Sequence, residues 1–107
     1  MKLLITIVQD QDVPILLDTL MQEGYSATKL ASTGGFMRVG NTTLLIGVED
    51  EKVESALALI KKVSKKREQY ELDPMAPLSS AVLPKMDKVT VGGAIVFIVD
   101  VERFEKI

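Results

Sequence analysis

The order of secondary structure begins with KLLITIVQDQDVPILLDTLMQEG, residues 2–24. Over residues 2–8, apolar side chains occupy both faces of an alternating pattern, which is typical of a central strand covered on both sides. The spacing becomes helical after Asp12, a predicted N-cap that is followed by Pro14 in the first turn. Gly24 is predicted to end this helix. Its apolar face comprises Val13, Leu16, Leu17, Leu20 and Met21.

A second strand–helix unit follows a weaker strand candidate at residues 25–31. Residues 42–48, TTLLIGV, are predicted to form a strand, and Asp50 is the predicted N-cap of the next helix. Acidic residues gather at the start of that helix and lysines near its end, an order that favours the helix dipole. We therefore interpret both charge clusters as helix-stabilising, not as a metal or nucleic-acid site. The apolar face comprises Val53, Ala56, Leu57, Ile60 and Val63.

The last part of the chain is less regular. Residues 67–87 match neither period and contain three prolines, so they are predicted to form a long loop of the kind that usually has a function. Residues 88–101, KVTVGGAIVFIVDV, are predicted to form one long final strand. Gly92 and Gly93 interrupt it, which indicates a bulge or a close approach by a ligand or another chain.

The predicted order is β-α-β-β-α-β over a single domain, residues 1–107. This order indicates an α+β, ferredoxin-like fold, in which an antiparallel four-stranded sheet carries both helices on one face. The strands are nevertheless apolar on both faces, and an exposed apolar sheet face predicts association. We therefore expect an oligomer whose subunits pack their sheet faces together, with closed ring symmetry.

Composition narrows the possible functions. The chain has no Cys and no His, which excludes thiol nucleophiles, thiolate metal sites and imidazole chemistry, whereas carboxylate sites for hard metals and Lys or Asp chemistry remain open. No paired acids mark an obvious cleft, so we expect a non-enzyme without a metal site. The net charge of −2 provides no basic field for nucleic acid. The longest apolar runs are short, so we expect no membrane span and a cytoplasmic location.

The clearest candidate for a site is the segment 32–43, STGGFMRVGNTT. Glycine lets backbone approach a ligand closely, adjacent amides can form an anion-binding concavity, and Phe36 offers a flat face to a ring. These features favour a flat, phosphorylated ligand such as a nucleotide, whereas the alternative is a plain glycine-rich turn.

Among ferredoxin-like proteins, an RNA-recognition module and a metallochaperone fit poorly, because sheet aromatics are few and cysteines are absent. A small-molecule phosphatase has only Arg38 and Asn41 in its favour. An amino-acid-sensing domain and a nucleotide-sensing trimer of the PII kind remain open.

Several motifs agree in order and spacing with one family. The run TKLASTGGF at 28–36, GNTT at 40–43 and IGVED at 46–50 resemble the PII-like cyclic-di-AMP receptor family, as do residues 7–12 and 91–94. The resemblance covers nearly the whole chain.

This resemblance implies a homotrimeric, non-enzymatic signalling protein with no cofactor other than its ligand, cyclic di-AMP. Three sites would lie between neighbouring subunits, with Phe36 stacking on an adenine and Gly92 and Gly93 approaching from the neighbour. Binding would reorder loops, the 67–87 segment above all, and thereby control an effector protein. The ligand-binding residues implied are Ala27, Thr28, Gly35, Phe36, Met37, Asn41, Gly47, Gly92 and Gly93.

The sequence departs from the family pattern at two positions. Family members carry Asn and Arg where this chain has Gly24 and Ser26. The alternative function is therefore a PII-like trimeric adaptor that binds a different nucleotide or small anion, or has lost cyclic di-AMP binding.

Overall fold

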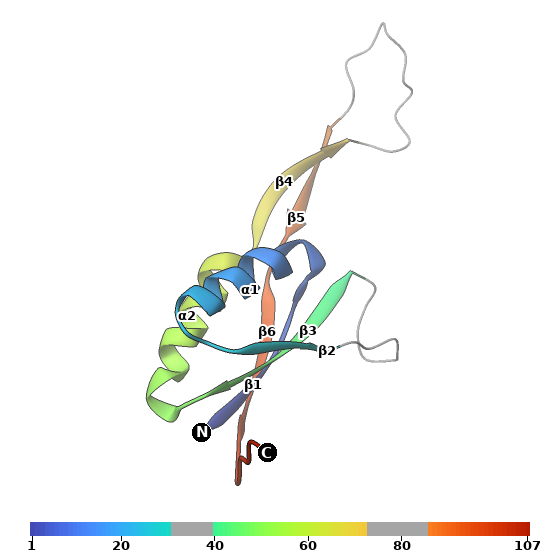
Figure 1. Ribbon diagram of the computed structural model, residues 1–107. Helices are drawn as coiled ribbons and strands as arrows, with labels where there is room; N and C mark the ends of the chain where they lie inside the picture. Colours follow the sequence, from blue (N-terminus) through green and yellow to red (C-terminus); the bar gives the residue numbers. More distant parts are fainter. Residues whose placement is uncertain (31–39, 73–85) are drawn as a thin grey trace, which may run out of the picture.

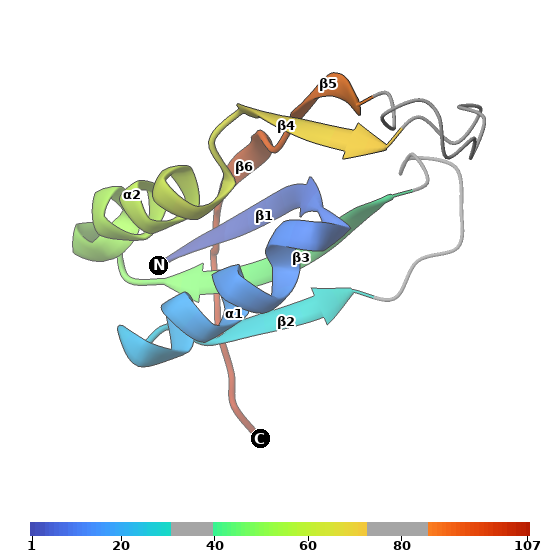
Figure 2. The same cartoon turned by 90° about the horizontal axis from the view of Figure 1, so that it is seen from above.

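A computed structural model describes residues 1–30, 40–72 and 86–107. Four strands form an antiparallel sheet in the order β2-β3-β1-β6, and both helices cover one of its faces (Figures 1 and 2). The predicted ferredoxin-like β-α-β-β-α-β arrangement is confirmed. The sheet strands are β1 (Lys2–Gln9), β2 (Ala27–Leu30), β3 (Asn41–Val48) and β6 (Ala94–Asp100), and the helices are α1 (Val13–Gln22) and α2 (Val53–Ser64).

The core lies between the helices and one face of the sheet. On β1, the side chains of Leu4, Thr6 and Val8 are buried, whereas the alternate residues are only partly covered. This alternation follows the two-residue period of a strand, which sends neighbours to opposite faces. The buried apolar residues that complete the core are Val13, Leu16, Leu20, Leu44, Ile46, Val48, Val53, Ala56 and Ile60.

The other face of the sheet carries apolar side chains without a covering layer. Leu3, Ile5 and Ile7 of β1 lie opposite Val99, Phe97 and Ile95 of β6 in the antiparallel register. Those β6 side chains are 44%, 51% and 58% exposed, respectively. We call this surface the open face. The expectation that the strands are apolar on both faces is therefore confirmed for β1 and β6.

Both helices begin differently from the prediction. A 3-10 turn precedes each of them, η1 (Asp10–Asp12) and η2 (Asp50–Lys52), and neither Asp12 nor Asp50 makes a side-chain cap hydrogen bond. The 3-10 turn already supplies backbone hydrogen bonds at each helix start, which leaves the two carboxylates for other partners. Asp12 is buried against Arg67, and Asp50 binds the amino group of Met1 at 2.9 Å. Asp12 thus occupies the predicted N-cap position of α1 without capping the helix through its side chain, whereas the N-cap predicted at Asp50 is wrong, because Lys52 holds that position of α2.

The end of α1 agrees with the sequence. Gly24 has φ +84°, and its amide donates to the carbonyl of Met21 at 3.0 Å. Helix α2 ends at Ser64, so that Lys61 and Lys62 lie in its last turn, as the dipole argument requires, whereas Lys65 and Lys66 lie beyond it.

The predicted irregular loop at 67–87 is partly wrong. Strand β4 (Arg67–Leu72) pairs antiparallel with β5 (Met86–Val91) in a separate two-stranded sheet, which projects away from the main sheet (Figure 1). We call this ribbon the arm. Residues 73–85, the remainder of the predicted loop, lie outside the described residues.

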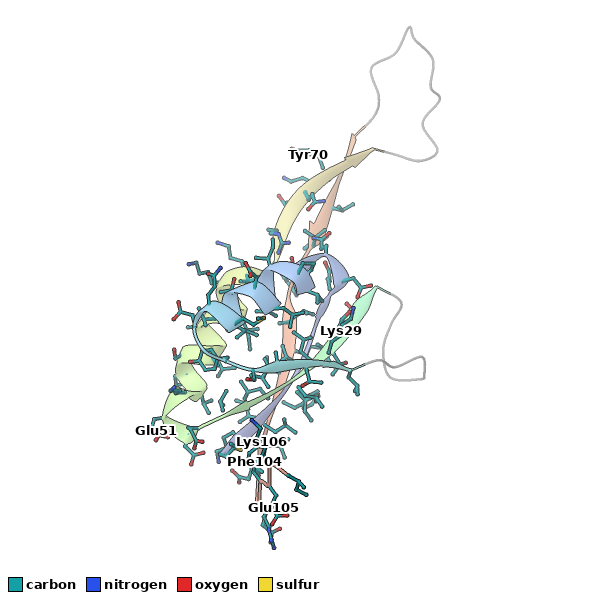
Figure 3. All side chains as sticks on the ribbon, in the orientation of Figure 1. Lys29, Glu51, Tyr70, Phe104, Glu105 and Lys106 are labelled. Carbon is teal, nitrogen blue, oxygen red and sulfur yellow. The ribbon has the colours of Figure 1, made fainter. Side chains whose placement is uncertain are left out.

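The single final strand predicted at 88–101 is also wrong. Gly92 and Gly93, with φ of +89° and +92°, divide it into β5 of the arm and β6 of the main sheet. Glu68, Tyr70, Lys88 and Thr90 share one exposed face of the ribbon, while Val91 on the other face is buried. The arm was not predicted because β4, REQYEL, has polar residues on both of its faces and so lacks the alternation of a half-buried strand. Tyr70 lies on the arm, far from the C-terminal end (Figure 3).

Candidate functional site

The predicted site residues fall into two groups on the main sheet. Thr28 and Gly47 line one pocket, while Asn41, Gly92 and Gly93 line another. Asn41 and Gly47 lie at opposite ends of β3, six positions apart, which corresponds to roughly 20 Å of extended strand. One chain therefore does not bring the two groups together. Gly35, Phe36 and Met37 lie outside the described residues.

The first group lines a hollow of about 480 Å³, which we call the Thr28 pocket. Thr28 pairs with Leu45 across the β2–β3 ladder, so its side chain emerges on the open face. Gly47 leaves its part of the floor free, because nothing lies within 4 Å of where its Cβ would be. Phe104, 64% exposed, lines the rim near the C-terminus (Figure 3). The remaining lining residues are Met1, Leu3, Ser26, Leu45 and Val101.

The second group lines a hollow of about 300 Å³ at the arm end of the sheet, which we call the Asn41 pocket. Asn41 begins β3 opposite Gln9, the last residue of β1. Among the described lining residues, Lys66 alone is cationic, and it gives the pocket a positive charge suited to a phosphate. Ile7, Ala94 and Ile95 supply an apolar wall.

Gly92 and Gly93 line this pocket, but both of their amides bind partners within the chain. The Gly92 amide donates to Oε1 of Gln9 at 2.7 Å, and the Gly93 amide donates to the carbonyl of Ser64. Both donors are therefore engaged within the chain. At Gly92 the close approach is made by the chain itself, because a Cβ there would lie 2.5 Å from the Lys65 carbonyl oxygen and 2.9 Å from that of Ser64. An approach by a ligand or another chain stays a prediction.

Two neighbours of Thr28 differ in what they offer. Ala27 is partly buried against the core and lines a separate shallow hollow with Gly24, Tyr25 and Ser26. Lys29 pairs with Leu44, a core residue, so it lies on the sheet face opposite Thr28. Lys29 therefore does not supply positive charge to the Thr28 pocket.

Gln9, Lys66 and Phe104 line the two pockets but were not predicted from the sequence. Gln9 belonged to a motif that resembled the receptor family, but its side-chain contact joins residues 83 positions apart and no local pattern reveals it. Lys66 was assigned to the end of a helix that in fact stops two residues earlier. Phe104 follows the last strand, beyond the range of the alternating pattern.

Within the described ranges, no helix is long and apolar enough to cross a membrane. The same ranges contain no group of three or more histidine, cysteine or acidic side chains placed to hold a metal ion.

The ferredoxin-like sheet, its open face and the two pockets define a PII-like ligand-binding domain. A family model described as "Cyclic-di-AMP receptor" matches residues 1–107, and the chain belongs to this family. It is similar to a solved structure described as a functionally unknown protein from Pediococcus pentosaceus ATCC 25745. The two share 42% identity over 99% of this chain and 96% of that one, with a TM-score of 0.78.

Proposed function

We propose that the protein is a homotrimer that binds cyclic di-AMP in clefts between neighbouring subunits and passes the signal to an effector protein. The observation that carries this proposal is the position of the two pockets at opposite ends of β3. Family membership supports cyclic di-AMP as the ligand, and the separation of the pockets supports a site shared between chains.

A ring provides the geometry that joins the pockets. In a closed ring each subunit uses two different surfaces, so that the Thr28 pocket of one chain meets the Asn41 pocket of the next. The open face supports such an assembly. Ile95, Phe97 and Val99 form a contiguous exposed apolar patch, and such patches mark interaction surfaces, unlike single exposed apolar residues.

Each group of residues has a distinct role in the proposed site. Thr28 donates a hydrogen bond to the ligand, and Gly47 leaves room beside it. Lys66 attracts a phosphate, Asn41 offers its side-chain amide, and Gly92 and Gly93 form part of the pocket wall that the nucleotide contacts. Ala27 supports the strand that carries Thr28. From the glycine-rich segment, Gly35 and Met37 contact an adenine on which Phe36 stacks.

The arm is the element that we propose responds to the nucleotide. Its base, at Gly92, borders the Asn41 pocket, and its remainder projects away from the sheet, where a partner can reach it (Figure 1). A ligand shifts such an element only if it binds one arrangement more tightly than another.

Isothermal titration with cyclic di-AMP, with cyclic di-GMP and ATP as controls, tests the ligand. We expect saturable binding of about one cyclic di-AMP per chain, as a shared site in a ring requires. Phe36→Ala and Asn41→Ala are expected to weaken binding at least about tenfold, equivalent to 1.4 kcal/mol. No heat, together with an unchanged melting temperature, would instead favour the adaptor alternative, in which Gly24 and Ser26 accompany loss of the ligand.

Subunit mixing tests whether the site is shared. Thr28→Val and Asn41→Ala chains, each defective alone, are co-expressed with different tags and purified as mixed trimers. If one subunit supplies Thr28 and its neighbour supplies Asn41, every mixed trimer regains one of its three sites, about a third of the total. If both residues serve the same site from one chain, mixing restores none.

A further inference from the structure

The short connection between β1 and α1, residues 9–12, contacts three other parts of the protein. The Gln9 side chain accepts a hydrogen bond from the Gly92 amide at 2.7 Å. The Asp10 amide donates to the carbonyl of Gly40 at 2.8 Å, and its carboxylate accepts from the Thr42 hydroxyl. Asp12 binds the Arg67 guanidinium. One turn thus holds the start of β3 and both strands of the arm at their base.

The ion pair at the arm base is built into the core. Asp12 is only 2% exposed, and both of its oxygens accept from Arg67, Oδ1 from Nη2 at 2.5 Å and Oδ2 from Nη1 at 3.4 Å. The hydrogen bond to Asp12 raises the pKa of the guanidinium. Nη1 also donates to the carbonyl of Lys65 at 3.2 Å, so the pair is joined to the end of α2. A buried carboxylate requires such a partner.

The second arm strand is held equally closely. Val91, the last residue of β5, is 8% exposed, and a Cβ at Gly92 would lie 2.5 Å from the Lys65 carbonyl oxygen and 2.7 Å from Nη1 of Arg67. The Gly93 amide donates to the Ser64 carbonyl. Beyond the base, the described side chains of the ribbon at residues 68–70 and 88–90 are exposed or only partly covered, and an isolated pair of strands is marginally stable in water. The orientation of the arm therefore depends on its base.

We propose that residues 9–12 form a joint that fixes the angle of the arm and couples it to the Asn41 pocket. Asp12 and Gln9 hold the arm, and Asp10 holds the start of β3, beside Asn41. A nucleotide that displaces Asn41 or Gly92 moves the joint, and the joint moves the arm. The coupling half of this inference rests on the proposed function, whereas the holding of the arm does not.

Spin-label distances test the joint without ligand. The chain has no Cys, so Tyr70→Cys on the arm and Glu54→Cys on α2, both exposed, provide the two labelling positions. Labelled chains are diluted with unlabelled chains, so that an assembly rarely carries more than one pair. We expect one narrow distance population, and a broad one when Arg67→Gln is added. Lys88→Gln, which removes the exposed Lys88–Glu68 pair within the arm, is the control and should leave the population narrow.

Arg67→Gln leaves Asp12 buried without its partner, so the double variant Asp12→Asn/Arg67→Gln is measured as well. It should broaden the distribution as much as Arg67→Gln does, because both lose the same pair. A distribution as narrow as the wild type in the double variant would overturn the proposal that this pair holds the arm.

Cyclic di-AMP tests the coupling. We expect it to shift the distance population of the wild type, and Thr42→Val, which removes the hydrogen bond between the Asp10 carboxylate and β3 but keeps the backbone bond to Gly40, to reduce the shift while titration still detects binding. Binding to the wild type without a shift would overturn the coupling. Absence of binding to the wild type would contradict the proposed function, and with it the coupling, while the ligand-free distances would still decide whether the joint holds the arm.

Discussion

Gly24 and Ser26, where the chain departs from the family pattern, lie in different environments. Gly24 ends α1 with φ +84°, a conformation that glycine and asparagine adopt more readily than other residues. Glycine in place of asparagine therefore preserves the turn. Ser26 lines the Thr28 pocket, and an arginine in its place would bring a positive charge to that pocket. Among the described lining residues, the amino group of Met1 is the one other source of positive charge. Of the two departures, Ser26 bears more directly on ligand affinity.

Ser26→Arg is expected to tighten cyclic di-AMP binding by about ten- to a hundredfold. A charge-assisted hydrogen bond to a phosphate contributes roughly 1.5–3 kcal/mol, and each 1.4 kcal/mol corresponds to about tenfold in affinity. Isothermal titration measures the change, with Ser26→Gln as a long but neutral control. Equal affinities for the two variants would contradict a phosphate near this position.

The Met1–Asp50 pair predicts a pH dependence of stability. The hydrogen bond to Asp50 raises the pKa of the Met1 amine, and the same contact lowers the pKa of Asp50. The amine's contribution is complete below its unfolded pKa of about 8 and is lost as pH rises through the folded pKa, while that of Asp50 is complete above about pH 4 and is lost as pH falls. The pair therefore stabilises the fold between these limits.

The melting temperature of Asp50→Asn, subtracted from that of the wild type at each pH, measures this contribution. The difference should be largest between about pH 4 and pH 8 and should shrink on both sides. Asp100→Asn is the control, because Asp100 pairs with Lys2, whose pKa is raised above its ordinary value. The difference in melting temperature between the wild type and Asp100→Asn should therefore persist to higher pH. A difference for Asp50→Asn that does not vary with pH would exclude the ion pair as its cause.

At the scale of elements, the arm depends on the glycine between β5 and β6. A side chain at Gly92 is opposed twice, by φ +89° and by backbone oxygens of Ser64 and Lys65 within 3 Å of the new Cβ. Gly24 has a similar φ of +84°, but nothing lies within 4 Å of its Cβ position. The two glycines therefore separate conformational strain from steric overlap.

Gly24→Ala is expected to lower the free energy of unfolding by about 1–2 kcal/mol, the cost of a left-handed alanine. Gly92→Ala should lower it further, by about 1–3 kcal/mol more, because the neighbouring backbone must shift. Urea unfolding at one protein concentration measures both. Equal losses would mean that the backbone around Gly92 shifts to accommodate the alanine at no cost in free energy.

At the scale of the whole molecule, a substitution on the open face can test association without disturbing the fold of the single chain. Phe97 is 51% exposed in the single chain and lies opposite Ile5, away from the core. Ile15 of α1 is 62% exposed on the helical side. A charge at either position leaves the core of the chain intact, but only Phe97 lies on the surface that we propose is covered in the trimer.

Phe97→Lys is therefore expected to yield monomers, whereas Ile15→Lys should leave the oligomeric state unchanged. A buried, unpaired lysine is strongly unfavourable at an apolar interface. Light scattering coupled to size-exclusion chromatography measures the mass, and circular dichroism verifies that each variant folds. A trimeric Phe97→Lys would place the interface elsewhere.

The sequence alone determined the order of the main elements, the apolar character of both sheet faces and the resemblance to the receptor family. These features were accessible because each depends on residues close together in the chain, such as the alternation in KLLITIV or the spacing within TKLASTGGF. Gly24 was identified for the same reason, because a helix end has a local signature.

Other features became visible only in three dimensions. Strand β4 of the arm has polar residues on both faces, so its sequence lacks the apolar–polar alternation of a half-buried strand, and the split of the candidate site into two pockets depends on strand register. Asp12 matches the local pattern of an N-cap, yet Arg67, 55 positions away, is its partner. Contacts between distant residues form when packing brings their backbones together, and a sequence pattern of short period contains no record of them.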